Sequence, residues 1–138
     1  MAYSSITKPG DHFNTVTYTG NGSTNAITGV GFQPDWVWLK VRSAGSGQDH
    51  TLYDAVRGTT KFIESNTTDA EATGSNYLTA FGTDGFTLGN DQSHVNASSD
   101  TYVSWNWLAA GATPSQTYTV KVVSDGGNKY RFDDYGTS

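Results

Sequence analysis

The sequence predicts an all-β protein built as an antiparallel β-sandwich, and two observations carry this prediction. The first is composition: the 138 residues include 20 Thr and 11 Asp but only 5 Leu and 2 Glu. That balance disfavours helix, because Thr loses rotamer freedom there and Asp competes for backbone hydrogen bonds. The second is spacing. Short alternating segments recur about every 8 to 12 residues between turn residues, which is typical of a sandwich or barrel.

The first half of the chain contains the clearest strand signals. Residues 13–19 alternate, the turn residues 20–23 follow, and residues 24–30 alternate again, which predicts a hairpin. Residues 36–41 form the strongest candidate strand. Its two faces are both apolar, with Trp36 and Trp38 on one and Val37 and Leu39 on the other, so we expect it to be central in its sheet.

The second half continues the series. Strands are expected at 50–56, 61–65, 77–81, 86–88 and 102–109. A helical turn is expected at 67–74, where Thr67 or Thr68 supplies a cap, and a polar loop at 90–100. Many short strands separated by turns favour a jelly roll as the topology of the sandwich.

The pattern restarts after residue 111. A polar segment with one proline is followed by alternation over 117–124, a turn at 125–128 and a further short strand at 129–132. The predicted organisation is a β-sandwich over 1–111, a linker over 112–117, and a C-terminal hairpin over 118–138. A lone hairpin is marginally stable. It therefore either packs on the main domain, pairs with a neighbouring chain, or opens a second β domain.

Charge and hydropathy exclude two kinds of partner. The formal net charge is −5, and the eight basic residues are scattered along the chain, so we expect no nucleic-acid partner. No apolar run approaches the roughly 20 residues of a membrane span, and the first residues lack the pattern of a signal peptide. We therefore expect synthesis as a soluble chain in a cytoplasm, without membrane insertion.

Two Trp-x-Trp pairs are the most distinctive feature. Trp36 and Trp38, like Trp105 and Trp107, project in pairs from one face of a strand, about 7 Å apart. One interpretation is an aromatic surface on which sugar rings stack. The interpretation favoured by the residues is a core role, because Trp buries up to about 250 Å² and few other large side chains are available. The candidate ligand-binding residues are Trp36, Trp38, Trp105, Trp107, Tyr102 and Asn106.

No constellation of catalytic or metal-binding residues stands out. The absence of Cys excludes thiol chemistry, and the three His residues lie far apart without metal-ligand spacing, so no cofactor or metal is expected. No facing pair of carboxylates for glycoside hydrolysis is marked. Asp54 and Arg57 are expected to form an ion pair that specifies the fold, and Asp84-Gly85 to form a turn. The chain is therefore not expected to be an enzyme.

Several strings in fixed order resemble a known domain. They are KPGDHFNTVTYTGNGSTNAITGVGFQPDWVWLKVRS, LYDAVRGTTKFIESNTTDAEA, FGTDGFTLGN and TYVSWNWLAAG. They resemble a domain of undefined biochemistry that recurs in structural proteins of tailed bacteriophages, especially marine and cyanobacterial ones, and that is similar to the concanavalin-like jelly roll of lectins. The resemblance covers about residues 5–111, and the tail from Tyr118 resembles the opening of a second β domain.

The resemblance implies a virion structural protein, a tail-fibre-like or surface module for host attachment or assembly. The localisation expected from it is the surface of the virion, with other virion proteins and a host-surface glycan as partners. A homo-oligomer is the expected assembly, since symmetric assembly is the default and fibres are commonly trimers. Two alternatives stay open at this point: a capsid decoration protein, and a carbohydrate-active enzyme on the same sandwich. The resemblance transfers no catalytic residues.

Overall fold

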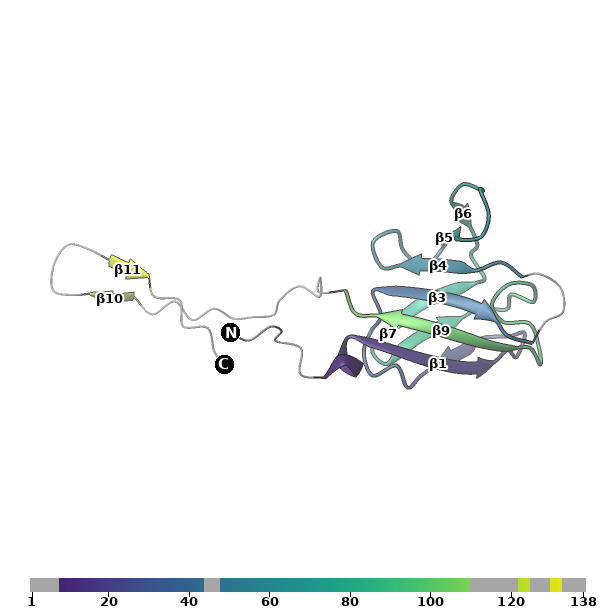
Figure 1. Cartoon of the computed structure of the whole chain (residues 1–138), viewed down its shortest axis with the longest axis horizontal. Helices are drawn as coiled ribbons and strands as arrows, with labels where there is room; N and C mark the ends of the chain where they lie inside the picture. The colour runs from purple at the N-terminus through teal and green to yellow at the C-terminus, as the bar shows by residue number, and fades with distance from the viewer. Residues whose placement is uncertain (1–7, 44–47, 110–121, 125–129, 133–138) are drawn as a thin grey trace.

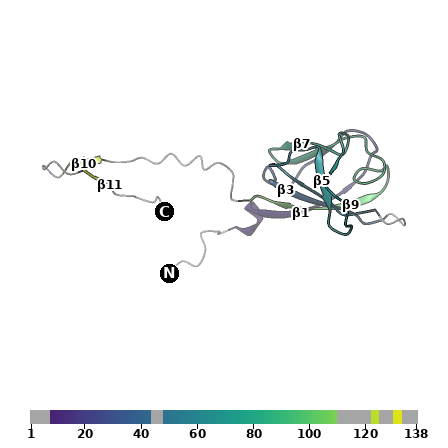
Figure 2. The ribbon, with the colours of Figure 1, turned by 90° about the horizontal axis from the view of Figure 1, so that it is seen from above.

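Two antiparallel sheets pack as a sandwich in the computed structural model of the protein (Figures 1 and 2). The structure describes residues 8–43, 48–109, 122–124 and 130–132. The larger sheet has six strands, in the spatial order β1 (Phe13–Thr19), β9 (Thr101–Trp107), β3 (Trp36–Val41), β4 (Thr51–Asp54), β5 (Lys61–Glu64) and β6 (Ala72–Thr73). The smaller has three, in the order β2 (Asn25–Ile27), β8 (Gly85–Leu88) and β7 (Leu78–Gly82).

The predicted fold class is confirmed, and the strands fall close to their predicted positions. Every pairing among the described strands is antiparallel. Residues 36–41 form β3, which lies inside its sheet between β9 and β4, as its two apolar faces indicated. The finer prediction of a jelly roll stays a prediction.

The core lies between the two sheets. The alternate side chains of β3 that point inward, Val37 and Leu39, meet Leu78, Phe86 and Leu88 of the smaller sheet. Burial of an aliphatic or aromatic side chain of this size stabilises the fold by about 1.5–3 kcal/mol. The buried members of this cluster are Ile27, Val37, Leu39, Tyr53, Phe62, Leu78, Phe86, Leu88 and Val95.

One predicted pairing is wrong. Strands 13–19 and 24–30 were expected to form a hairpin, but β1 pairs with β9 and β2 pairs with β8 of the other sheet. The chain crosses between the sheets after Gly20, whose N–H donates to Asp100 O at 2.8 Å. Asn25 Nδ2 then donates to Thr19 O at 3.1 Å, which fixes the crossing. Alternation indicates that both segments are extended, but it does not identify their partners.

The helical turn expected at 67–74 is also wrong. The hydroxyl of Thr67 accepts a hydrogen bond from the N–H of Asp69 at 3.2 Å, but no helix follows and the chain extends into β6. The one helical segment of the described residues is the 3₁₀ turn η1 (Pro9–Asp11). Thr and Ser side chains stabilise isolated turns such as the one at Thr67, as well as the first turns of helices.

The polar loop expected at 90–100 is closely packed against the β1–β2 crossing. Asp91 is 3% exposed, and its carboxylate accepts hydrogen bonds from the N–H groups of Ser93, His94 and Val95. Burial alone would raise the pKa of Asp91, but these N–H groups outweigh it and hold the pKa below its ordinary value. Asn96, fully buried, donates to Ser23 O and Gly89 O at 2.6 and 2.7 Å. The loop therefore ties the two sheets together.

The C-terminal hairpin is confirmed in its strands. β10 (Val122–Ser124) pairs with β11 (Tyr130–Phe132) in a sheet of their own. The linker predicted at 112–117 lies outside the described residues, as do most of residues 118–138.

Candidate functional site

The four tryptophans lie on the outer face of the six-stranded sheet, not in the core. Along β3 the residues alternate between partly buried and fully buried, and the partly buried positions are Trp36, Trp38 and Lys40. Along β9 the same alternation leaves Trp105 and Trp107 outside. The favoured prediction of a core role is therefore wrong, because the interior is filled by other large side chains, among them Tyr53 and Tyr102.

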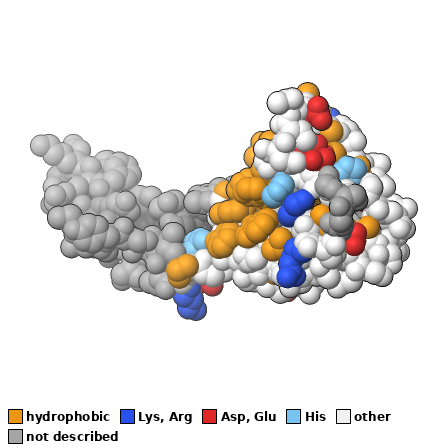
Figure 3. Space-filling model, turned by 45° about the vertical axis from the view of Figure 1, so that its right-hand side comes forward, with side chains coloured by type: hydrophobic (Ala, Val, Ile, Leu, Met, Phe, Trp, Pro, Cys, Tyr) orange, Lys and Arg blue, Asp and Glu red, His pale blue; other side chains and the backbone are white. Residues whose placement is uncertain are grey.

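Strand register brings the two Trp pairs together. Trp36 lies opposite Trp107, and Trp38 lies opposite Trp105. Their ring centroids are 4.3 Å and 5.5 Å apart, and Trp36 and Trp38 are 6.2 Å apart along β3. Phe13 of β1 continues the row at 4.8 Å from Trp107 and is 39% exposed. These five rings are called the tryptophan platform below, and Figure 3 shows a hydrophobic surface patch on this side of the domain.

The inward positions of β9 explain why the tryptophans face out. Tyr102, Ser104 and Asn106 occupy them, all fully buried, and the two nearest the tryptophans are polar. Asn106 Nδ2 donates to Ser104 Oγ at 3.0 Å and to Asn14 O at 3.1 Å. Because side chains on a strand alternate in direction, Trp105 and Trp107 lie on the solvent side when Ser104 and Asn106 point inward. A one-residue shift of either strand would turn its two indoles inward and its inward-facing side chains out to solvent.

Two of the predicted ligand-binding residues do not belong to the platform. Tyr102 and Asn106 are both 0% exposed and point into the sandwich. The Tyr102 hydroxyl accepts a hydrogen bond from the N–H of Ala97 at 2.9 Å, and its ring stacks on Tyr18 at 5.0 Å. These two residues hold the fold together and are inaccessible to a surface ligand.

His50 closes one side of the platform. The indole Nε1–H of Trp38 donates to His50 Nδ1 at 2.9 Å, and the ring centroids are 5.6 Å apart. Burial and the neighbouring Lys40 cation both lower the pKa of His50. Because Nδ1 accepts this bond, the imidazole is neutral and its proton is on Nε2. Trp38 is thereby held in a fixed orientation and presents its ring, rather than its N–H, to solvent.

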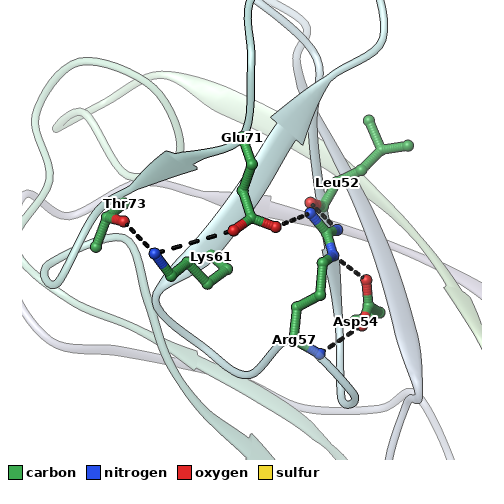
Figure 4. Close-up of polar contacts among 6 residues, drawn as sticks. All are labelled: Leu52, Asp54, Arg57, Lys61, Glu71 and Thr73. Atoms are coloured by element: carbon green, nitrogen blue, oxygen red, sulfur yellow. Dashed lines mark hydrogen bonds and ion pairs between the residues drawn. The ribbon is translucent and has the colours of Figure 1, made fainter.

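The expected ion pair between Asp54 and Arg57 is present (Figure 4). It lies in the turn after β4, where both side chains are about a quarter exposed, so it is less buried than predicted. Arg57 Nη1 also contacts Glu71 at 3.3 Å, and Lys61 contacts the same carboxylate at 3.9 Å. Burial alone would raise the pKa of Asp54, but the backbone N–H and guanidinium of Arg57 lower it. These charges link the turn after β4 to the segment before β6.

The carboxylate of Asp84 stabilises a loop by hydrogen bonds. Asp84 Oδ1 and Oδ2 accept hydrogen bonds from the N–H groups of Gly31 and Gly29 at 2.6 and 3.1 Å, and Asp84 lies in the predicted turn between β7 and β8. Within residues 8–43 and 48–109, no group of three or more His, Cys, Asp or Glu is placed to hold a metal ion. No helix of the described part is long and apolar enough to cross a membrane.

Sequence reasoning identified the four tryptophans as candidates but missed the residues that complete the platform. Phe13 could have been found, because it is in phase with the outer positions of its strand. His50 could not, since its approach to Trp38 depends on the pairing of β3 with β4.

Comparison with known proteins adds the family of the chain. No curated protein and no solved structure matches it. The model of one family, described as a domain of unknown function (DUF7483), matches residues 8–126, which includes the whole sandwich. The chain belongs to the DUF7483 family.

Proposed function

We propose that this protein is a non-catalytic attachment module that binds a saccharide on the tryptophan platform. One observation carries the proposal: four indoles and a phenyl ring occupy the solvent face of a sheet whose core is already filled. Large aromatic side chains gathered on an exposed surface mark interaction sites, because their burial by a partner is favourable.

The spacing of the rings suits a sugar chain. Tryptophans two residues apart on a strand are separated by about 7 Å, and the neighbouring strand adds a second row about 5 Å away. Pyranose rings present apolar C–H faces that stack on indoles, while their hydroxyls remain in water. Tilted rings, at 37° to 60° to one another, form a contoured rather than a flat surface, which favours a short segment of saccharide over a crystalline polymer.

We further propose that the module works on a bacteriophage virion, as a tail-fibre-like or surface component that attaches the particle to its host. The support is the ordered set of strings that resembles domains of phage structural proteins, together with a Thr-rich, Ser-rich β-sandwich suited to a persistent exposed part. A capsid decoration protein is the alternative position on the particle. Mass spectrometry of purified virions tests this step, and absence of the chain from intact particles would refute it.

The binding proposal is tested with Trp variants. We expect wild-type protein to bind members of a glycan array, and Trp36→Ala and Trp105→Ala each to lower the affinity about tenfold, equivalent to about 1.4 kcal/mol. Val56→Ala is the matched control, because Val56 is apolar and 96% exposed but lies in the turn after β4 and is not one of the platform residues. Thermal unfolding followed by circular dichroism checks that each variant folds.

Three results would contradict the proposal. The first is an array without binding while Trp fluorescence is protected from quenchers and the mass in solution is that of an oligomer. In that case the platform is an interface between copies of the chain. The second is equal loss of binding in Val56→Ala. The third is turnover of a polysaccharide that is abolished by Asp54→Asn or Glu64→Gln, which would make the protein an enzyme.

A further inference from the structure

Two basic residues extend the tryptophan row of β3. Lys40 occupies the next outward position after Trp36 and Trp38. Arg42, which is exposed, follows with the same alternation, and its backbone N–H donates to Thr101 O at 2.7 Å, so the chain stays beside β9 past the end of β3. Figure 3 shows Lys and Arg side chains along the border of the hydrophobic patch.

These two cations differ from the other basic residues of the sheet. Among the described residues, Arg57 and Lys61 form ion pairs with carboxylates, whereas neither Lys40 nor Arg42 does. Lys40 Nζ donates to Gln48 O, which leaves two of its three protons for a ligand. The positive charge is thus local, on a chain whose formal net charge is −5.

The nearby carboxylates have other partners. Asp49, next to His50 in the sequence, accepts a hydrogen bond from Asn66 Nδ2 at 2.7 Å. Asp100 accepts one from the Ser43 hydroxyl at 3.2 Å. Burial is the main cause of the lowered pKa of His50, and the Lys40 cation outweighs the Asp49 carboxylate there. An anionic group beside Trp38 would meet the Lys40 ammonium and the Arg42 guanidinium.

This inference rests on the proposed saccharide binding and deepens it: we infer that the ligand is an acidic saccharide, with a sugar ring on Trp38 and its anionic group against Lys40 and Arg42. Positions 38 and 40 are about 7 Å apart, which long flexible side chains easily span. The fork of Arg42 pairs with two oxygens of a carboxylate or sulfate, and Lys40 adds a point charge. Carboxylated and sulfated sugars share this chemistry.

The first test compares matched ligands by calorimetry. Oligogalacturonate is compared with its methyl ester, a sulfated galactan with its desulfated form, and a sialylated oligosaccharide with its asialo form. We expect at least one acidic member to bind about tenfold more tightly than its neutral counterpart. We also expect the preference to shrink at high salt, because exposed charges are screened. The arm that shows the preference identifies a carboxylate or a sulfate as the recognised group.

The second test uses variants that separate charge from stacking. Arg42→Gln and Lys40→Gln together are expected to remove most of the preference while affinity for the neutral ligand is kept. Arg42→Gln is also measured alone. Lys40→Gln removes the hydrogen bond from Lys40 to Gln48 O as well as a charge, whereas Arg42→Gln leaves that hydrogen bond in place. Lys61→Gln is the control, because it removes the same charge from a cation that is paired with Glu71.

The outcomes distinguish the two proposals. If neutral and acidic ligands bind wild-type protein equally, and Trp36→Ala weakens both, saccharide binding stands and the acidic preference is wrong. A preference that survives the double variant, or that Lys61→Gln lowers equally, also refutes it. If no saccharide of any class binds, both proposals fail together.

Discussion

The hydrogen bond between Trp38 and His50 makes one side of the platform sensitive to protonation. Nδ1 of His50 accepts from the indole N–H, so a protonated imidazole cannot make this bond. The pKa of His50 is lowered in the folded protein, first by burial and then by Lys40. Three effects therefore oppose protonation of His50 in the folded state: burial of the imidazole, the positive charge of Lys40, and loss of the hydrogen bond from Trp38.

We expect the protein to lose stability when the pH falls below the ordinary histidine pKa of about 6.5. Because the folded-state pKa is the lower one, the unfolded chain takes up the proton first, and stability that is fully present above pH 6.5 declines as the pH falls toward the folded-state value. Urea unfolding midpoints between pH 8 and pH 5 measure this. His50→Gln, which keeps an acceptor but does not titrate, should flatten the profile. An unchanged profile would show that His50 has no part in it.

At the scale of single residues, the sequence identified the aromatic residues of the site but not the face of the sheet on which they lie. Trp36, Trp38, Trp105 and Trp107 were found as candidates by their spacing alone, yet their assignment to the core was wrong. Alternation shows that two sets of residues face opposite ways, but it does not say which set faces inward when both are bulky. On β9 the inner row holds Ser104 and Asn106 beside Tyr102, and the buried hydrogen bond between Ser104 and Asn106 lets polar side chains take these positions.

At the scale of elements, the crossing from β1 to β2 depends on one close approach. A side-chain carbon at Gly20 would lie 2.1 Å from the carbonyl oxygen of Ala97 in the 90–100 loop. No real contact is so short, so the loop or the strand end would have to move. The hydrogen bonds of Gly20 with Asp100 and Ser99 lie at the same point and would be lost with that movement.

We therefore expect Gly20→Ala to destabilise the protein by more than about 2 kcal/mol, in the range of substitutions that force backbone to move. Chemical denaturation measures the loss, and hydrogen exchange should show it first in the 90–100 loop. Gly10→Ala is the matched control, because an added carbon there meets nothing within 4 Å. If Gly20→Ala is as stable as Gly10→Ala, the loop does not depend on this approach.

Strands were predicted well and their connections poorly. β1 and β3 have the predicted bounds, because alternation and turn residues are local signals. The hairpin expected after β1 is wrong, since pairing is decided by distant residues such as Asn96, which contacts the crossing across 71 to 75 residues of sequence. The sequence indicates only that the 90–100 loop is polar, because composition does not reveal which polar groups hydrogen-bond to one another.

At the scale of the whole molecule, the two described sheets of the sandwich use only strands between Phe13 and Trp107. The hairpin of β10 and β11 forms a separate sheet. The sandwich therefore has its own core and its own strand pairing within the segment that the sequence predicted as one domain.

We expect deletion of residues 112–138 to leave the thermal unfolding midpoint of the sandwich within a few degrees of the full chain. Circular dichroism measures the midpoint, and light scattering gives the mass of each form. A shared midpoint with a smaller mass for the shortened chain would assign oligomerisation to the C-terminal segment. A large drop in the midpoint would show that this segment stabilises the sandwich, and the predicted domain boundary would be wrong.

The antiparallel pairing of β1 with β9 also determines how the domain would respond to mechanical tension. Phe13 lies opposite Trp107, and Leu108 N–H donates to His12 O, so the chain enters and leaves the sandwich at adjacent points. β1 is an edge strand. Tension applied to the two ends of the chain therefore loads the hydrogen bonds between β1 and β9 one after another, from the Phe13 end onward. The first bonds to open are those beside Phe13 and Trp107. Force on the chain would therefore separate Phe13 from Trp107 before it opens the pairing of β9 with β3, so that a ligand bound across these two rings would lose one of its contacts under load.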